Sequence, residues 1–228
     1  MTQTGSAMSE TLVKHSLASQ LRAEIMSGTL RPGVRIVEGT WARRLGVAQG
    51  SIREAINILA QEGFVTKASG RSARVVNLSE EDILHLYALR GALEGLAART
   101  AASLKADVTK LQLALDGMCA AAKDGRCEVL LDQDLEFHLE LCRLSGNPFL
   151  VAHSRRILLP LFAFVRIRVI ADRRGTEAWK RDLESHQKII DLLVDGDADV
   201  AEVYVRKAMT RYAMTAFDAW EKKGNEAG

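Results

Sequence analysis

Four polar residues lie at positions where the helical pattern around them is otherwise apolar. Asp134 and His138 are four residues apart in a segment whose apolar residues repeat at helical spacing, so both face the interior. His186 holds an equivalent position in a later amphipathic segment, and Arg90 does so in an earlier one. Burying these groups is costly unless they pair with one another, with a metal or with an anion. Two interpretations stay open: a divalent-metal and ligand pocket built on Asp134, His138 and His186, or a self-satisfied polar cluster.

Amphipathic helices joined by short loops must position these residues. Ser79-Glu80-Glu81-Asp82 has the pattern of a capping box at the start of the first helix. Asn147-Pro148 is a cap-and-first-turn signal, and Pro160 predicts a kink. The later helices are expected over residues 106–123, 128–144, 148–171, 177–194 and 198–222. No strand pattern interrupts this sequence, which therefore predicts an antiparallel all-α bundle.

Residues 38–62 contain two short apolar stripes at helical spacing, separated by Leu45-Gly46-Val47. The central glycine can take the positive φ of a tight turn, so the pattern is typical of a helix-turn-helix. Its second helix would expose Gln49, Ser51 and Arg53 near the N-terminus, where recognition helices contact bases and phosphates. An ordinary helical hairpin would show the same two stripes.

Two β-prone runs follow, residues 64–67 and 73–76, and the basic, glycine-containing segment 68–72 joins them. With a first helix expected over residues 13–27, they predict a winged helix-turn-helix whose basic hairpin suits a phosphate or minor-groove contact. The candidate DNA-contacting residues are Arg43, Arg44, Gln49, Ser51, Arg53, Lys67, Arg71 and Arg74.

Charge is divided unevenly along the 228 residues, although the net charge is only +2. Through Leu78, ten Lys and Arg stand against five Asp and Glu, whereas the remainder has 21 against 24. A basic N-terminal part suits DNA phosphates. We therefore expect a disordered tail over residues 1–11, a winged helix-turn-helix domain over 12–77 and a helical effector-binding and dimerisation domain over 78–223.

The composition indicates a cytoplasmic protein. Hydrophobic residues make up 47% of the chain, which is ordinary for a soluble globular protein. We expect no membrane partner, because no apolar run approaches the length of a membrane span and residues 1–9 lack a signal-peptide core. The three cysteines are odd in number and have no metal-binding spacing, so we interpret them as reduced thiols.

The N-terminal part resembles a known family. The runs LRAEIMSGTLRPGVRIVE and ARRLGVAQGSIREAINILAQEGFV are similar to the winged-helix domain of GntR-family bacterial transcription regulators, over residues 13–77. The family usually has Ser-Arg-Thr-Pro at positions 48–51, so its contacting arginine is replaced by Gln49, and a second family arginine falls at Gly39. Arg53 matches. Because glutamine can pair with adenine, the resemblance implies an altered sequence preference.

The C-terminal part resembles the effector domain, the FCD domain, of the FadR-type branch of that family. The resemblance rests on RGALEGLAAR from Arg90, DLEFHLELCRLSGNPFL from Asp134 and SHQKIIDLLVDGD before residue 198. In many members an aspartate and three histidines hold a metal that helps to bind a small carboxylate effector. Asp134, His138 and His186 match three of these ligands, but the fourth position, 22 residues after His186, is Ala208.

The resemblance thus implies either a three-ligand site for zinc, nickel or manganese, or a metal-free pocket. Arg90 is the candidate partner of an anionic effector because its planar fork suits a carboxylate. Tyr212, one turn beyond Ala208, is a further candidate effector contact. The effector-binding set is Arg90, Asp134, His138, His186 and Tyr212.

We expect a ligand-responsive transcriptional repressor that binds a pseudo-palindromic operator in double-stranded DNA as a homodimer, with a small organic acid bound in the helical domain. We do not expect an enzyme. One alternative is a helical metalloenzyme in which Asp134, His138 and His186 activate water, but the sequence shows no evident general base beside them. Another alternative is a winged helix used for protein contact only.

Overall fold

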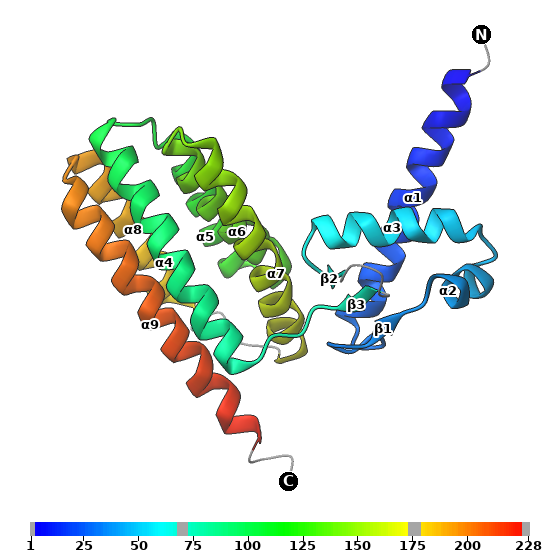
Figure 1. The fold of residues 1–228 in the computed structure, drawn as a ribbon. Helices are drawn as coiled ribbons and strands as arrows, with labels where there is room; N and C mark the ends of the chain where they lie inside the picture. The colour runs from blue at the N-terminus through cyan, green and yellow to red at the C-terminus, as the bar shows by residue number, and fades with distance from the viewer. Residues whose placement is uncertain (1–2, 68–72, 173–178, 225–228) are drawn as a thin grey trace. The chain divides into compact units, whose positions relative to one another are not determined.

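The computed structural model describes residues 3–67, 73–172 and 179–224. The chain divides into two compact units, residues 1–77 with 162–172, and residues 78–161 with 173–228. The expectation of a mainly helical protein with a winged helix-turn-helix and an α-helical bundle is confirmed (Figure 1).

The first unit is a winged helix. Within residues 1–77, the described part contains three helices and a three-stranded antiparallel sheet of order β1-β3-β2. The elements are α1 (Gln3–Met26), β1 (Arg35–Ile36), α2 (Glu38–Leu45), α3 (Gln49–Gln61), β2 (Val65–Thr66) and β3 (Ala73–Val75). Arg35 pairs with Arg74, and Thr66 pairs with Arg74 from the other side, so β3 is the central strand.

The turn between α2 and α3 forms where the sequence places it. Gly46 follows α2 with φ +66°, a conformation that glycine adopts without steric strain. This turn lets α3 fold back so that its apolar stripe packs mainly on α1. The buried residues that join the helices are Leu17, Leu21, Ile25, Trp41, Ile52, Ala55, Ile56 and Leu59.

Three Arg–Glu ion pairs connect the three helices of this unit. They join α1 to the end of α3, α1 to α2, and α2 to the start of α3. Because they are partly exposed, each contributes little to stability, but each fixes a side chain in one orientation. The pairs are Arg22–Glu62 at 2.7 Å, Arg44–Glu24 at 2.9 Å and Arg53–Glu38 at 2.8 Å.

One expectation for this unit differs from the structure, and another falls on residues outside the described ones. The backbone is helical from Gln3, where a disordered tail was expected over residues 1–11. Apart from Gly5, residues 3–12 have no glycine or proline to stop α1 from extending towards the N-terminus. Met1, Thr2 and the hairpin tip at residues 68–72 lie outside the described residues.

The second unit is a bundle of helices that lie side by side (Figure 1). Its helices are α4 (Glu80–Ser103), α5 (Thr109–Lys123), α6 (Cys127–Leu144), α7 (Pro148–Asp172, of which residues 162–172 group with the first unit), α8 (Lys180–Asp195) and α9 (Ala198–Gly224). The capping box at Ser79 and Asp82 is confirmed, since each side chain bonds to the backbone N–H of the other residue. α5 begins at Thr109 instead of residue 106, and the Asp107 carboxylate accepts a hydrogen bond from the Thr109 N–H at this end of the helix.

α4 is the central helix of the bundle, because it packs on α6, α8 and α9. Its contact with α9 is close: a Cβ atom at Gly95 would lie 2.8 Å from Arg206 Cγ and 3.3 Å from the Glu202 carbonyl. The core around it includes the fully buried side chains of Ala98, Leu111, Phe137, Leu141 and Val205.

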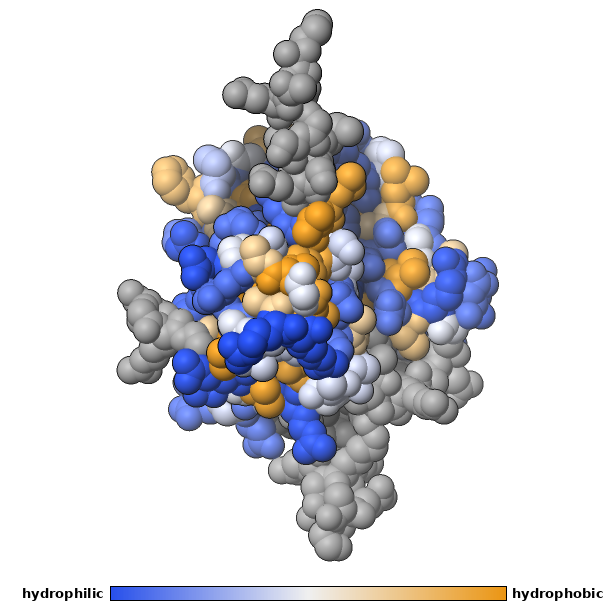
Figure 2. Space-filling view, turned by 90° about the vertical axis from the view of Figure 1, so that its right-hand side faces the viewer, coloured by the Kyte–Doolittle hydropathy of each residue, from blue (hydrophilic) through white to orange (hydrophobic). Residues whose placement is uncertain are grey.

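One apolar stretch corrects an expectation from the sequence. Pro148–Ile167 in α7, which contains Pro160, is long and apolar enough to cross a membrane by length and composition. In the structure 39% of this stretch is buried, and Leu158, Leu161 and Phe164 are among its buried side chains. On the face shown in Figure 2, hydrophilic residues cover much of the surface and apolar residues form separate groups between them.

Candidate functional site

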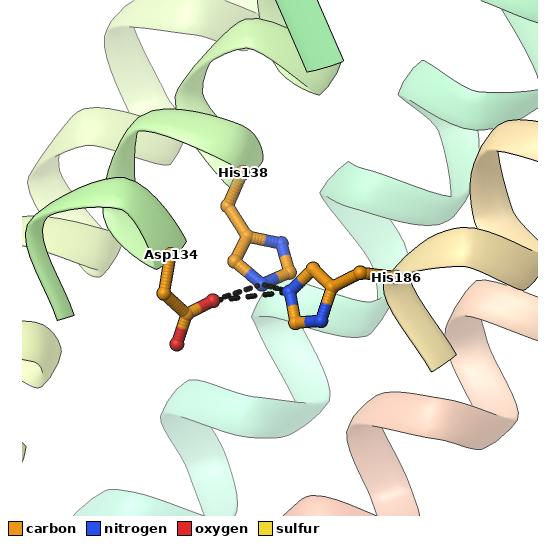
Figure 3. Close-up of side chains that lie close together, drawn as sticks. All are labelled: Asp134, His138 and His186. Atoms are coloured by element: carbon orange, nitrogen blue, oxygen red, sulfur yellow. Dashed lines mark hydrogen bonds and ion pairs between the residues drawn. The ribbon is translucent and has the colours of Figure 1, made fainter. Parts of the chain in front are cut away.

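Asp134, His138 and His186 come together in the second unit, as the sequence analysis predicted (Figure 3). α6 carries Asp134 and His138 one turn apart, and α8 brings His186 opposite them. Asp134 Oδ1 lies 3.2 Å from His138 Nε2 and 3.1 Å from His186 Nε2. The two Nε2 atoms are 3.2 Å apart, and both imidazoles are buried. Three potential ligand atoms therefore converge on one point.

The outer nitrogen of each imidazole is held by an acceptor. His138 Nδ1 lies 2.6 Å from Glu94 Oε2, and His186 Nδ1 lies 2.6 Å from the Asp182 carbonyl oxygen. An ionised carboxylate and a carbonyl can only accept, so both Nδ1 atoms carry hydrogen. A neutral imidazole then has its lone pair on Nε2, pointing inward, whereas a protonated imidazole donates from Nε2 to Asp134. Such outer partners are typical of histidines that ligate metals.

Charges around the cluster shift its pKa values. Burial and Arg90 oppose protonation of His138, but Glu94 and Asp134 outweigh them, so its pKa is raised. Burial also works against ionisation of Asp134, but hydrogen bonds from His138 and His186 hold its pKa well below the usual range. The negative charge of Asp134 and the raised pKa of His138 both favour a cation, a proton or a metal, between Asp134 and the two imidazoles.

Glu94, like Asp182, belongs to the site but was not predicted from the sequence. Arg90 Nε donates to Glu94 Oε1 at 2.6 Å, and both side chains are buried. Glu94 thus bridges Arg90 and His138. The signal in the sequence was the spacing, because a glutamate four residues after an inward arginine lies on the same face of the helix.

Tyr212 on α9 and Asp182 on α8 form the next group of polar residues. Burial, together with the charge of Asp134, raises the pKa of Asp182 to about 6, and a hydrogen bond with Tyr212 partly opposes this. Burial and the charge of Asp182 raise the pKa of Tyr212. Ala208, one turn before Tyr212, is completely buried.

The acidic groups outnumber the basic ones in this cluster. Glu94, Asp134 and Asp182 carry carboxylates, whereas Arg90 supplies the guanidinium and is already bonded to Glu94. With neutral imidazoles these described groups together are net negative and oppose an anionic ligand, and a proton on His138, whose pKa is raised, makes the group less negative. A divalent cation held between Asp134 and the histidines would reverse that sign.

The candidate DNA-reading residues of α3 lie at its exposed N-terminal end. Gln49 and Arg53 are exposed, and Ser51 is half-buried. The Glu38 carboxylate of α2 accepts from both of the exposed side chains, at 3.2 Å from Gln49 Nε2 and 2.8 Å from Arg53 Nη2. This contact was not predictable from the sequence, because Glu38 lies eleven residues before Gln49 and fifteen before Arg53.

On α2 the two candidate arginines differ. Arg44 pairs with Glu24 at 2.9 Å, and its guanidinium lies 4.5 Å from the centre of the Trp41 ring. Its role is therefore partly structural. Arg43 is exposed.

The wing carries the remaining candidate DNA-contacting residues. Lys67 donates to Asn57 Oδ1 at 2.7 Å, and Arg74 donates to the Gly33 carbonyl at 3.0 Å. Both side chains are exposed. Arg71 lies outside the described residues.

Comparison with known proteins identifies both parts of the chain. Residues 85–211 match the FCD domain, and residues 14–75 match the bacterial regulatory proteins of the gntR family. The chain belongs to the GntR family. It is a DNA-binding transcription regulator of the GntR type with an FCD domain, and this decides against the metalloenzyme alternative.

Curated relatives agree over most of their length. The chain is 28% identical over 201 residues to the "Probable D-xylose utilization operon transcriptional repressor" of Paenarthrobacter nicotinovorans, covering 86% of this chain and 87% of the relative. It is 31% identical over 177 residues to the Nta operon transcriptional regulator of Aminobacter aminovorans, covering 77% and 80%. The solved structure of E. coli McbR/YncC has the same fold, with a TM-score of 0.69, 16% identity and coverage of 91% of this chain and 98% of that one.

Proposed function

We propose that this GntR-family regulator is a repressor that binds a pseudo-palindromic operator as a homodimer and is controlled by a small organic acid. Residues 12–77 would form the DNA-binding domain and residues 78–223 the effector-binding and dimerisation domain. We expect the protein to act in the cytoplasm, where bacterial DNA lies. Repression is supported by relatives such as the D-xylose operon protein, which is named a repressor.

A divalent metal fits the cluster in the FCD domain. Asp134 offers an oxygen, and His138 and His186 each offer an Nε2 atom whose ring is oriented by an acceptor on Nδ1. One carboxylate and two imidazoles suit zinc, nickel or manganese. A bound metal would act as a Lewis acid towards a carboxylate. Because Ala208 offers no ligand, coordination positions would stay open for that carboxylate or for water.

The charge of the cluster supports an organic acid only together with the metal. Arg90 is bonded to Glu94, so its charge is already matched within the protein. Asp134 and Asp182 would repel a carboxylate in the absence of a cation. Once a metal is held, Tyr212 and Asp182 lie where they can bond to further polar groups of the effector. Because relatives are named for the D-xylose and gluconate operons, we choose hydroxylated, sugar-derived acids as the first effectors to test.

A homodimer is supported by symmetry and by one exposed face. Two copies of a winged helix match the two half-sites of a pseudo-palindromic operator. On the outer face of α4, Leu89 and Leu96 are seven residues apart and are 53% and 44% exposed. A second subunit would cover such apolar side chains.

The observation that carries the proposal is the match of residues 14–75 to the GntR winged helix, with Gln49 and Arg53 exposed at the start of α3. The test is selection of duplexes from a random library, followed by fluorescence anisotropy of the selected duplex at increasing salt. We expect one enriched pseudo-palindrome and a linear fall of log K with log salt. If no duplex bound even at low salt, the winged helix would instead serve protein contact only.

A further inference from the structure

Glu38 accepts hydrogen bonds from two of the three candidate DNA-reading residues of α3, Gln49 and Arg53. It is the first residue of α2, and its side chain is 25% exposed. Arg53 donates to it through Nε at 3.0 Å and through Nη2 at 2.8 Å, while Gln49 donates through Nε2 at 3.2 Å. One carboxylate therefore bridges the two helices of the helix-turn-helix at the end where a recognition helix meets DNA.

We propose that Glu38 is a specificity-determining positioning residue: it orients Gln49 and Arg53 for one base sequence and weakens attraction to every other duplex. The proposal rests on operator binding by the winged helix, as proposed above. It assigns to Glu38 an effect on discrimination between DNA sequences, in addition to its effect on the packing of α2 against α3.

Glu38 fixes the orientation of the Arg53 and Gln49 side chains. Because Nε and Nη2 of Arg53 face Glu38, Nη1 is the guanidinium nitrogen that this carboxylate leaves available. Gln49 gives one hydrogen of Nε2 to the carboxylate, which fixes its amide and leaves Oε1 as an acceptor. A Cβ atom at Gly39 would lie 4.0 Å from Gln49 Oε1 and 3.8 Å from Arg43 Nη1, so the glycine avoids a side chain beside both groups. Fixed amides and guanidinium groups are the units that recognise base edges in the major groove.

The negative charge of Glu38 also affects how Arg53 attracts DNA. The hydrogen bond from Arg53 lowers the pKa of Glu38, so the carboxylate is ionised at neutral pH. Its position at the N-terminus of α2 also favours the negative charge. An ionised carboxylate beside Arg53 reduces the attraction between Arg53 and any phosphate, which is the sequence-independent part of DNA binding. A cognate sequence offsets this loss through base contacts, whereas another sequence does not.

The test compares Glu38→Gln with the matched control Glu62→Gln. Glu62 accepts from Arg22 through the same two nitrogens, Nε at 3.0 Å and Nη2 at 2.7 Å, but Arg22 lies on α1 and is not a candidate DNA contact. Each full-length variant is titrated against the duplex selected by the unmodified protein and against a shuffled duplex of equal composition. Thermal unfolding checks that both variants are folded.

We expect Glu38→Gln to bind the shuffled duplex more tightly and to lose about ten-fold or more in the ratio of selected to shuffled affinity. Glu62→Gln should keep the ratio of the unmodified protein. Glu38→Asp retains the charge but is one methylene shorter, so it should lose affinity for the selected duplex without gaining any for the shuffled one. If Glu38→Gln does not fold, the comparison is made with Glu38→Asp instead.

An unchanged ratio in both folded Glu38 variants would overturn the role of Glu38 while leaving operator binding intact. An equal fall in the ratio of selected to shuffled affinity in Glu38→Gln and Glu62→Gln would also overturn this role. The effect would then come from the helix packing that both ion pairs support. Failure of the unmodified protein to select any duplex is a separate result, which would remove the proposed operator binding itself.

Discussion

The Nε2 atoms of His138 and His186 face each other across 3.2 Å, and each ring is held by an acceptor on its Nδ1. Two neutral imidazoles in this arrangement direct lone pairs at each other. The arrangement is unfavourable until a proton or a metal lies between the nitrogens, with Asp134 Oδ1 as the third contact. The site is thus arranged to hold a cation, either a proton or a metal.

His186→Ala should abolish tight metal binding, because it removes one of the three converging ligand atoms. We expect the protein to take up close to one equivalent of zinc, nickel or manganese per chain, measured by elemental analysis after gel filtration, and the variant to lose it. The matched control is His153→Ala, since His153 is an exposed histidine of α7. Equal metal content in both variants would show that the three residues form a purely structural cluster.

Ala208→His should strengthen metal binding. If the resemblance places Ala208 at the fourth ligand position, a histidine there adds an imidazole and should raise the affinity by about ten-fold or more. Ala208 is completely buried, so a larger side chain also disturbs the packing of α9. Ala208→Leu adds bulk without a ligand and separates the two effects. Isothermal titration that gives the same affinity for the histidine variant and the unmodified protein would contradict this placement.

Binding of an organic acid should require the metal. Without a cation the carboxylates of Asp134 and Asp182 repel an anion, and Arg90 is bonded to Glu94. We expect a panel of sugar-derived acids to raise the thermal unfolding temperature of the metal-loaded protein and to leave the chelator-treated protein unchanged. Equal shifts in both preparations would favour a metal-free pocket, in which Arg90 or Tyr212 binds the anion.

The sequence contained enough information for the main helices and for the three converging residues. Asp134 and His138 were predictable because helical spacing places residues four apart on one face, and His186 interrupts an otherwise apolar stripe. The partners of these residues depend on which helices become neighbours, which periodicity does not specify. Glu94 and the bridging position of Glu38 were therefore missed. The grouping of residues 162–172 with the first unit also had no signal in the sequence.

Arg53→Ala should weaken binding to the selected duplex by about ten-fold or more, because it removes a cationic donor from the start of α3. The slope of log K against log salt should also become shallower by about one if the contact is with a phosphate. Arg99→Ala is a suitable control: Arg99 is an exposed arginine of α4 and pairs with Asp199 and Glu202 in the helical unit. An affinity for Arg53→Ala equal to that of the control would argue against the docking of α3 on DNA.

Ser79→Ala should destabilise the helical unit, because it removes the cap from the N-terminus of α4. The Ser79 hydroxyl accepts from the Asp82 N–H at 3.1 Å, and Asp82 accepts in turn from the Ser79 N–H at 2.9 Å. Loss of such a cap lowers the free energy of unfolding by about 1 kcal/mol. Urea unfolding followed by circular dichroism measures this difference. Ser103→Ala, at the other end of α4, is exposed and should be neutral or slightly stabilising.

Asp82→Asn separates the charge of this cap from its hydrogen bonds. The bonds from Ser79 lower the pKa of Asp82 below its usual value of 3.8, so the folded state favours the ionised carboxylate. The stability that this provides is fully present above the pKa of the unfolded chain and is lost as the pH falls through the lower pKa of the folded state. The unmodified protein should therefore be more stable than Asp82→Asn at pH 7, and the difference should shrink towards pH 3. A constant difference across this range would mean that the charge of Asp82 does not contribute to the cap.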